Sequence, residues 1–312
     1  MPDREKYVVT VGGLCIDEYY HTSDWPAEGD KSMVVKDKDM VGGMIPNAAA
    51  VFSGYGVKTY FYDVMNHGAV TEYLLKNLQG YGIDTSMIRY DDSLPDAKCI
   101  VVLSGEERTI LVVDSQKPVL PLEGERLEIF RNASYIYTTM TEIKKFTGYM
   151  ELVKDLKEHG AQIVFDVESS TYLPEDAELL ESADILFFNE FGLAAYCDGR
   201  DEEECFQRLF ESGVKVVTVT LGAEGSYTRT PTEENRTPAL HMEIVDTTGA
   251  GDTFNSSFVR CLLNDMTISE AAKFSNAAAG RAITKFGPKG GVCPVEEVEK
   301  IMENYGDELS AQ

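Results

Sequence analysis

VDTTGAGDTF, residues 245–254, joins a turn of small residues, the start of a predicted helix and an acidic residue. Gly249, Ala250 and Gly251 carry almost no side chain, so their backbone N–H groups can surround an anion. We expect a helix over residues 250–264, whose dipole and unpaired amides favour negative charge at its start. Asp252 lies in the first turn, where it can accept the proton of a substrate hydroxyl that attacks the γ-phosphorus of ATP. The stretch therefore predicts an anion cradle, formed by residues 249–251, beside a general base.

A short Gly-x-Gly-Asp motif also has an ordinary interpretation, as a glycine turn whose aspartate only stabilises the helix. The whole run at 246–255 closely resembles the C-terminal signature of the ribokinase-like (PfkB) carbohydrate kinases. The resemblance implies an ATP-dependent sugar kinase that uses Mg²⁺. It also implies that Asp246 and Thr248 lie where many relatives bind potassium, which makes K⁺ a candidate activating cation.

The pattern along the chain alternates strands and helices, which is typical of a mostly parallel sheet covered on both faces. Strands are predicted at 7–11, 59–64, 135–137, 163–167, 185–188 and 216–221. Helices are predicted at 46–55, 70–78, 250–264, 268–286 and 295–305. Together with the resemblance, this pattern gives the expected fold class: α/β, ribokinase-like, with a mostly parallel central sheet, helices on both faces and a small β-sheet lid.

Two segments interrupt this alternation with short strand-like pieces and no helical period, at 19–41 and 95–115. From the pattern alone, surface hairpins and a small sheet that closes over a cleft are equally good interpretations. The resemblance favours the lid, because the family builds one from these two regions. We therefore expect a single kinase unit over 1–312, with a core of 1–16, 42–95 and 116–312 and a lid of 17–41 and 96–115. A homodimer formed through the lid is an arrangement that this organisation allows.

The composition argues against several classes of partner and site. The 312 residues include 53 acidic and 28 basic side chains, a net charge of −25, which repels nucleic acids and anionic membranes. No apolar run approaches the length of a membrane span, and residues 1–7 form a short polar lead rather than a signal peptide, so we expect a cytoplasmic protein. The six cysteines are scattered without a Cys-x-x-Cys pair and the four histidines lie far apart, which argues for a reducing compartment and against a zinc site.

Candidate residues for the sugar come from the first half of the chain. Gly42 and Gly43 let the backbone approach a ligand closely, and Asn47 offers a donor and an acceptor to a pair of hydroxyls. These three residues resemble the second family signature, and Asp17 matches the family's sugar-binding acid. Without the resemblance, Asp17 would be interpreted as a turn residue and Asn47 as a helix-cap or turn residue. Arg108 lies in the second lid segment, from which an arginine can grip phosphate as a lid closes, although its ordinary interpretation is a solvated hairpin residue.

The resemblance also assigns residues to the nucleotide. The turn after the strand at 216–221 resembles one that contacts the ATP phosphates and ribose, which assigns Thr220, Gly222 and Gly225 to this side. Asn276 lies on a stretch that resembles the lining of the adenine pocket. From the sequence alone, the turn would be a plain hairpin and the alanines beside Asn276 would be helix-packing positions.

The magnesium motif of the family is incomplete in this chain. Asn189 matches the first residue of Asn-x-x-Glu, but Gly192 stands where the glutamate is expected. Two interpretations remain open. Either Glu190 substitutes from a different position, or Mg²⁺ is held mainly by the ATP phosphates and Asp252, with Asn189 nearby.

The function expected from these features is transfer of the γ-phosphoryl group of ATP to a hydroxyl of a small sugar. Arg-Thr-Ile-Leu at 108–111 resembles ketohexokinases and favours a fructose-like ketose, whereas Met44 and Pro46 depart from the family motifs where sugar is contacted. A nucleoside kinase and a non-catalytic sugar-sensing protein on the same fold are the alternatives. A dinucleotide-dependent oxidoreductase fits poorly, because residues 12–16 lack the third glycine of its motif.

Overall fold

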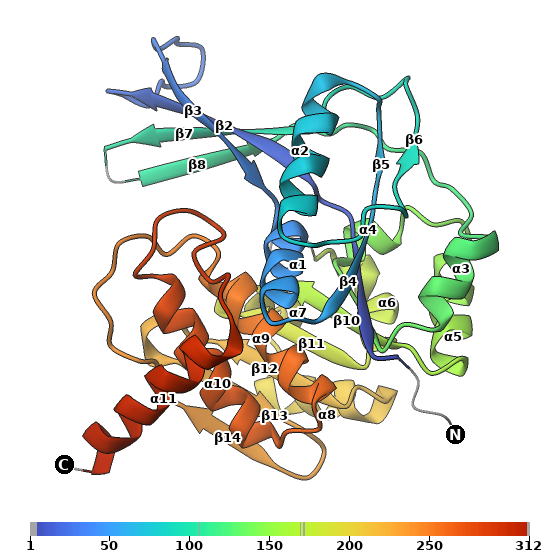
Figure 1. The fold of residues 1–312 in the computed structure, drawn as a ribbon, viewed down its shortest axis with the longest axis vertical. Coiled ribbons are helices and arrows are strands. Elements are labelled where there is room, and N and C mark those ends of the chain that lie inside the picture. Colours follow the sequence, from blue (N-terminus) through green and yellow to red (C-terminus); the bar gives the residue numbers. More distant parts are fainter. Residues whose placement is uncertain (1–4, 106, 169, 171, 311–312) are drawn as a thin grey trace.

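The computed structural model describes residues 5–105, 107–168, 170 and 172–310, with side chains described up to residue 303. Its main sheet has eight strands in the order β14-β13-β12-β11-β10-β9-β1-β4 (Figure 1). The neighbouring strands β12, β11, β10, β9, β1 and β4 run parallel to one another, whereas β13 and β14 add an antiparallel edge. Their bounds are β1 Tyr7–Val11, β4 Lys58–Tyr62, β9 Tyr135–Thr138, β10 Gln162–Val167, β11 Ile185–Asn189, β12 Val216–Thr220, β13 Ser226–Arg229 and β14 Glu234–Thr237. The expected mostly parallel sheet is confirmed.

Helices cover both faces of this sheet because successive side chains of a strand point to opposite sides. Val8 and Val164 belong to one apolar cluster, while their neighbours Val9 and Phe165 belong to another. The first face is covered by α1 Met44–Gly54, α2 Ala69–Gly80, α9 Ala250–Leu263, α10 Ile268–Ala282 and α11 Val295–Ser310. The second is covered by α3 Gly124–Arg131, α4 Met140–Ile143, α5 Tyr149–Glu158, α6 Ala177–Glu181, α7 Glu190–Cys197 and α8 Glu202–Ser212.

A second sheet of four strands forms a separate layer above the carboxyl ends of the main strands (Figure 1). Its order is β3-β2-β7-β8, with β2 parallel to β7 and the outer pairs antiparallel. The strands are β2 Cys15–Thr22, β3 Val35–Gly42, β7 Lys98–Ser104 and β8 Glu107–Val112. We call this sheet the lid, since it joins the two segments that interrupt the sequence pattern. Two short strands, β5 Val64–Met65 and β6 Arg89–Tyr90, pair beside it.

Three local features differ from the sequence-based expectation. The strand expected at 59–64 is divided at Asp63, between β4 and β5. The hairpin of β13 and β14 was not anticipated. The helix expected at 268–286 ends at Ala282, because the Ile283 carbonyl accepts hydrogen bonds from the backbone N–H groups of Val245 and Asp246. Ending there frees residues 283–291 to lie beside the anion cradle.

Within the described residues, every helix is too short or too polar to cross a membrane.

Candidate active site

Residues 249–251, the predicted anion cradle, lie at the N-terminus of α9, where the sequence predicts a helix to begin. Gly249 has φ 78°, and an added Cβ there would lie 2.0 Å from the Pro288 carbonyl oxygen, so only glycine fits. A Cβ at Gly251 would meet nothing within 4 Å. The space beside Gly251 at this end of α9 can therefore take an anion.

Asp252 is half-buried in the first turn of α9, and the Asn47 side chain donates a 2.8 Å hydrogen bond to its carboxylate. Burial, together with the negative charge of Asp166, raises the pKa of Asp252 well above its usual value, although the Asn47 bond and the Lys289 charge oppose this shift. A raised pKa makes a carboxylate a stronger base near neutral pH. The buried Asn47 Oδ1 atom has no hydrogen-bond partner among the described residues, so it is an acceptor ready for a ligand hydroxyl.

Asp166, at the end of β10, supports this arrangement and was not predicted from the sequence. Its Oδ2 atom accepts hydrogen bonds from the Tyr137 hydroxyl at 2.6 Å and the Asn255 amide at 2.9 Å. Asn255 lies three residues after Asp252 on α9, so these bonds connect the N-terminal part of the helix to the sheet. Burial raises the pKa of Asp166 to about 6, with the Glu168 charge contributing. The signal that could have found it is its place at the carboxyl end of a central parallel strand.

Steric contacts explain why the sugar-side motif has glycine at positions 42 and 43. A Cβ at Gly42 would lie 1.9 Å from the Asp17 Oδ2 atom, so the carboxylate occupies the space of a side chain. Gly43 has φ 105°, and its Cβ would lie 2.0 Å from the Gly13 carbonyl oxygen. Asp17 is therefore held over the start of α1, which carries Asn47. Burial raises the pKa of Asp17, while its hydrogen bond from Cys15 and the Lys289 and Arg108 charges act in the opposite direction.

Lys289 joins the site and was also missed by the sequence analysis. Its Nζ atom donates a 2.7 Å hydrogen bond to the Val41 carbonyl oxygen in the lid. Burial lowers the pKa of Lys289 to about 8, and the negative charges of Asp17 and Asp252 oppose the shift. The charges of both carboxylates thus act on one ammonium group, so the predicted sugar-binding acid and the predicted base lie in the same region of the molecule. The sequence signal that could have indicated Lys289 is the group of nearby glycines, Gly287, Gly290 and Gly291.

The lid contacts the residue before the cradle through Arg108, whose Nη1 atom donates a 2.6 Å hydrogen bond to the Thr248 Oγ1 atom. Beside it, Asp246 accepts hydrogen bonds of 2.9 Å from the backbone N–H groups of Thr248 and Gly287. Burial would raise the pKa of Asp246, but these bonds and the Arg108 charge outweigh it and lower the pKa. Asp246 therefore connects the loop before α9 to the loop after α10 through these hydrogen bonds. Its predicted role in binding K⁺ stays a prediction.

The predicted nucleotide residues gather at the carboxyl ends of β11 and β12. Asn189 and Thr220 are paired in the strand register. The Asn189 side chain caps α7 by accepting a 2.7 Å hydrogen bond from the Gly192 backbone N–H. A Cβ at Gly192 would lie 2.2 Å from the Val167 carbonyl oxygen, which explains why the glutamate of the family motif is absent from this position.

The remaining nucleotide-side residues lie around the β12–β13 turn. Gly222 and Gly225 have φ values of 54° and 97°, and a Cβ at Gly225 would lie 2.1 Å from the Thr237 carbonyl oxygen. Asn276 is buried and donates hydrogen bonds to the Ser226 hydroxyl at 2.8 Å and the Ala272 carbonyl oxygen at 2.9 Å. The Asn276 side chain thus joins α10 to β13, and its adenine role stays a prediction.

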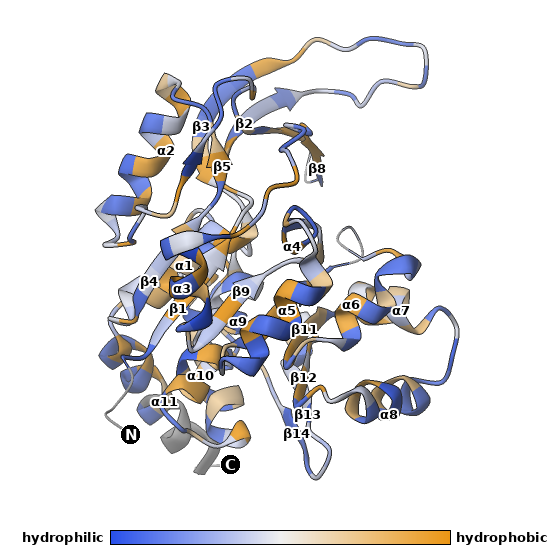
Figure 2. Ribbon diagram, turned by 90° about the vertical axis from the view of Figure 1, so that its right-hand side faces the viewer, coloured by the Kyte–Doolittle hydropathy of each residue, from blue (hydrophilic) through white to orange (hydrophobic). Residues whose placement is uncertain are grey.

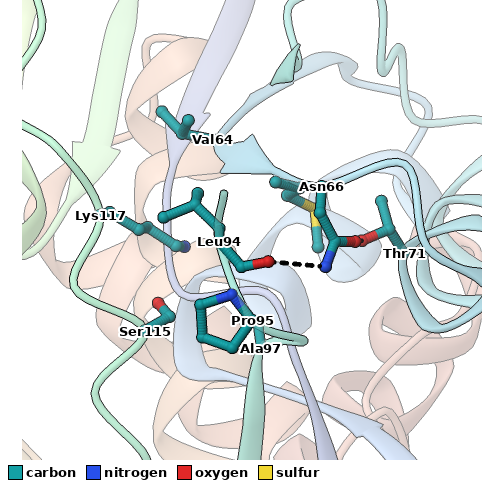
Figure 3. A pocket seen from close by; sticks show the side chains of 9 residues that line it. Val64, Asn66, Thr71, Leu94, Pro95, Ala97, Ser115 and Lys117 are labelled. Carbon is teal, nitrogen blue, oxygen red and sulfur yellow. Dashed lines mark hydrogen bonds between the residues drawn. The ribbon is translucent and has the colours of Figure 1, made fainter. Parts of the chain in front are cut away.

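A small pocket beside the lid, shown in Figure 3, is lined in part by Asn66, Leu94 and Lys117 and contains none of the predicted site residues. The Lys117 ammonium group lies 2.5 Å from the Asp63 carboxylate, and both side chains are buried. Asp63 also accepts a hydrogen bond from the Leu14 backbone N–H, three residues before Asp17. This ion pair therefore supports the loop that leads to Asp17.

Comparison with known proteins agrees with the geometry. Residues 5–293 match the family described as pfkB family carbohydrate kinase. Ribokinase from Arabidopsis thaliana is 28% identical over 292 residues, which cover 88% of this chain and 76% of that protein. The 5-dehydro-2-deoxygluconokinase of Geobacillus kaustophilus is 25% identical over 324 residues, 97% of this chain and 96% of that protein.

The solved structure of Arabidopsis thaliana ribokinase complexed with ribose and ATP is similar to this one, with a TM-score of 0.83 and 24% identity. The similarity covers 95% of this chain and 98% of that one, which confirms the ribokinase-like fold. Since the family match spans nearly the whole length and its signature forms the cradle and the acid described above, the chain belongs to the pfkB family of carbohydrate kinases.

Proposed function

We propose that this kinase transfers the γ-phosphoryl group of ATP to a hydroxyl of a small keto sugar, with Asp252 as the general base. The observation that carries the proposal is the pairing of Asp252 with Asn47 at the open end of α9. The carboxylate has a raised pKa, the amide has a free buried acceptor, and the cradle amides are directly adjacent. A base, a hydroxyl-binding group and an anion site thus occur together.

The proposed reaction uses these groups in turn. Asp17 and Asn47 hold hydroxyls of the sugar, and Asp252 accepts the proton of the reacting hydroxyl. That oxygen forms a bond to the γ-phosphorus while the bond from this phosphorus to the bridging oxygen of ADP breaks. The backbone amides of residues 249–252, together with Arg108 in the lid, stabilise the negative charge on the transferring group. Closure of the lid excludes water, which would otherwise accept the phosphoryl group.

Magnesium fits this site through oxygen ligands near the cradle. The ATP phosphates, Asp252 and Glu168 would hold the ion, with Asn189 nearby, because Gly192 has no room for a glutamate. Bound Mg²⁺ would neutralise phosphate charge.

We extend the proposal to a K⁺ ion bound at Asp246 and Thr248. Loss of activity when K⁺ is replaced by tetramethylammonium would support this site, and equal activity would exclude it.

The substrate class follows from the charges around the sugar. A fructose-like ketose is the first candidate, from the Arg-Thr-Ile-Leu resemblance at 108–111. A keto sugar acid is the second, because Lys289 and Arg108 both act on Asp17 and can pair with a substrate carboxylate. The similarity to 5-dehydro-2-deoxygluconokinases supports this second candidate.

A coupled ADP-release screen tests the proposal. The panel contains ketoses, keto sugar acids, aldoses and nucleosides, each with ATP and Mg²⁺. We expect the highest kcat/KM for a keto sugar, and Asp17→Ala and Asn47→Ala should weaken its use strongly while KM for ATP stays nearly unchanged. Highest activity on a nucleoside would favour the nucleoside-kinase alternative, and sugar binding without ADP release would favour the sensor.

We also propose that the lid forms a homodimer. Its edge strand β8 exposes Ile110, Leu111 and Val112, and the opposite edge strand β3 exposes Val35. Figure 2 shows the lid strands β2, β3 and β8 in the upper part of the view. An apolar edge strand is a surface that a second copy can cover. Sedimentation equilibrium should give a dimer for the parent and a monomer for Ile110→Asp, with Val119→Asp, which changes an exposed valine outside the lid, as the control. A monomeric parent would contradict the proposal.

A further inference from the structure

The lid brings together two thiols and a carboxylate that are far apart in the sequence. Cys15 and Asp17 lie two residues apart on β2, and Cys99 is the register partner of Asp17 on the parallel neighbour β7. The Cys15 and Cys99 sulfur atoms are 3.5 Å apart, and the Cys15 sulfur is 3.5 Å from the Asp17 Oδ1 atom. One ligand atom from each of the three residues lies within 4.8 Å of the others. The 84-residue separation of the cysteines hid this cluster from the sequence analysis.

These distances match the geometry of a tetrahedral metal site. With metal–sulfur bonds of about 2.3 Å and metal–oxygen bonds of about 2.0 Å, tetrahedral angles place two sulfurs about 3.8 Å apart and a sulfur and an oxygen about 3.5 Å apart. The observed separations are 3.5 Å for both pairs. The cluster therefore needs little movement to hold a cation.

The same residues are poorly placed for a disulfide bond. Cys15 is displaced by two positions from the register partner of Cys99. A strand spacing and a two-residue rise then separate their Cα atoms by about 8 Å. Disulfides usually join Cα atoms roughly 4.4–6.8 Å apart, so oxidation would require the two lid strands to move.

We propose that Cys15, Cys99 and Asp17 form a binding site for a thiophilic divalent cation of the Zn²⁺ type. Two thiolates select such a cation over Mg²⁺, which prefers oxygen ligands. Three protein ligands leave a fourth position open for water. The positive charges of Lys289 and Arg108 act on Asp17, so the excess negative charge of two thiolates and a carboxylate around the ion is partly balanced.

The site has a consequence for catalysis, which depends on the proposed sugar-binding role of Asp17. A cation bound to the Asp17 carboxylate removes the acceptor for a sugar hydroxyl. Zn²⁺ should therefore compete with the sugar and raise its KM, whereas kcat at saturating sugar stays the same. The cluster would make this kinase sensitive to free thiophilic metal ions.

Equilibrium dialysis of the reduced, metal-free full chain against Zn²⁺ alone tests the site. We expect one Zn²⁺ per chain, undisturbed by excess Mg²⁺, and a Kd at least about tenfold higher for Cys15→Ser, Cys99→Ser and Asp17→Asn, since loss of a ligand costs at least as much as loss of its outer-shell support. Cys197→Ser is the matched control, because Cys197 and Cys205 form a second thiol pair that has no third ligand among the described residues. Thermal unfolding verifies that each variant folds. Absence of stoichiometric binding, or parental affinity in both serine variants at positions 15 and 99, would overturn the proposal.

Sugar kinetics with and without Zn²⁺ separate this proposal from the proposed function. Competitive inhibition in the parent and in Cys197→Ser, absent in Cys99→Ser, supports both. Stoichiometric Zn²⁺ binding with an unchanged KM for the sugar would confirm the metal site and remove Asp17 from the sugar site.

Discussion

Replacing Asp166 by asparagine removes one buried negative charge and keeps the shape of the side chain. The amide oxygen of the new side chain can accept the hydrogen bonds that Tyr137 and Asn255 now donate to the Asp166 Oδ2 atom at 2.6 and 2.9 Å. The main change is therefore electrostatic. It affects both the stability of the fold and the basicity of Asp252, whose pKa is raised in part by the Asp166 charge.

The size of the stability effect follows from the pKa of Asp166. Burial raises this pKa to about 6 in the folded state, against about 3.9 for an unperturbed aspartate. The folded carboxyl holds its proton more tightly than the unfolded one, so ionisation lowers stability as pH rises through this interval. A difference of two pKa units is worth about 3 kcal/mol. Asp166→Asn has no such titration, so its stability relative to the parent should increase by about 3 kcal/mol between about pH 4 and pH 7 and stay constant above.

Urea unfolding of the parent and of Asp166→Asn across this pH range measures the difference. Asp252 also titrates differently in the variant, and its lower pKa there changes the relative stability in the same direction. The acidic limb of the kcat profile should also move to lower pH in the variant, since Asp252 loses a neighbouring negative charge. A stability difference that is independent of pH, with an unmoved kinetic profile, would refute the reasoning.

Three further predictions concern the sugar side and the lid. In Gly42→Ala the added Cβ would lie 1.9 Å from the Asp17 Oδ2 atom, so KM for the sugar should rise about tenfold or more in steady-state assays; an unchanged KM would show that this contact is not needed. Lys289 loses its proton near its pKa of about 8, so kcat/KM should fall above that pH in the parent but not in Lys289→Arg; identical alkaline limbs would count against a role for its charge. Sugar with a nucleotide analogue should slow amide exchange in 35–42 and 98–112 together, whereas unaltered exchange in both would favour independent hairpins.

Much of the fold could be predicted from the sequence because its parallel strands are short apolar runs with helices between them. The strands at 7–11 and 163–167 occur as expected. The β13–β14 hairpin was not predicted because its residues are mostly polar, including the buried Ser226 and Thr228, and lack the apolar signal of a buried strand. The end of α10 at Ala282 depends on a tertiary contact from Val245 and Asp246, which no local pattern encodes.

The candidate site was predicted where a motif carries several residues at fixed spacing, as in the cradle with Asp252. It was missed where single residues come from distant segments. Lys289 and Asp166 have no signature of their own and become part of the site only through the packing of the lid and α9. Cys15 and Cys99 meet through strand register alone, although their spacing in the sequence indicated no metal site.

The central claim is that Asp252 accepts the proton of the sugar hydroxyl, and turnover of Asp252→Asn tests it most directly. The variant keeps the shape of the side chain but cannot accept a proton, so kcat should fall by roughly a hundredfold or more while sugar binding and folding stay largely intact. Asp246→Asn is the control, since Asp246 fastens the loops at 245–249 and 283–291 and should retain clearly more activity. If Asp252→Asn folds normally and turns over within a few-fold of the parent, Asp252 is not the base and only stabilises the start of α9.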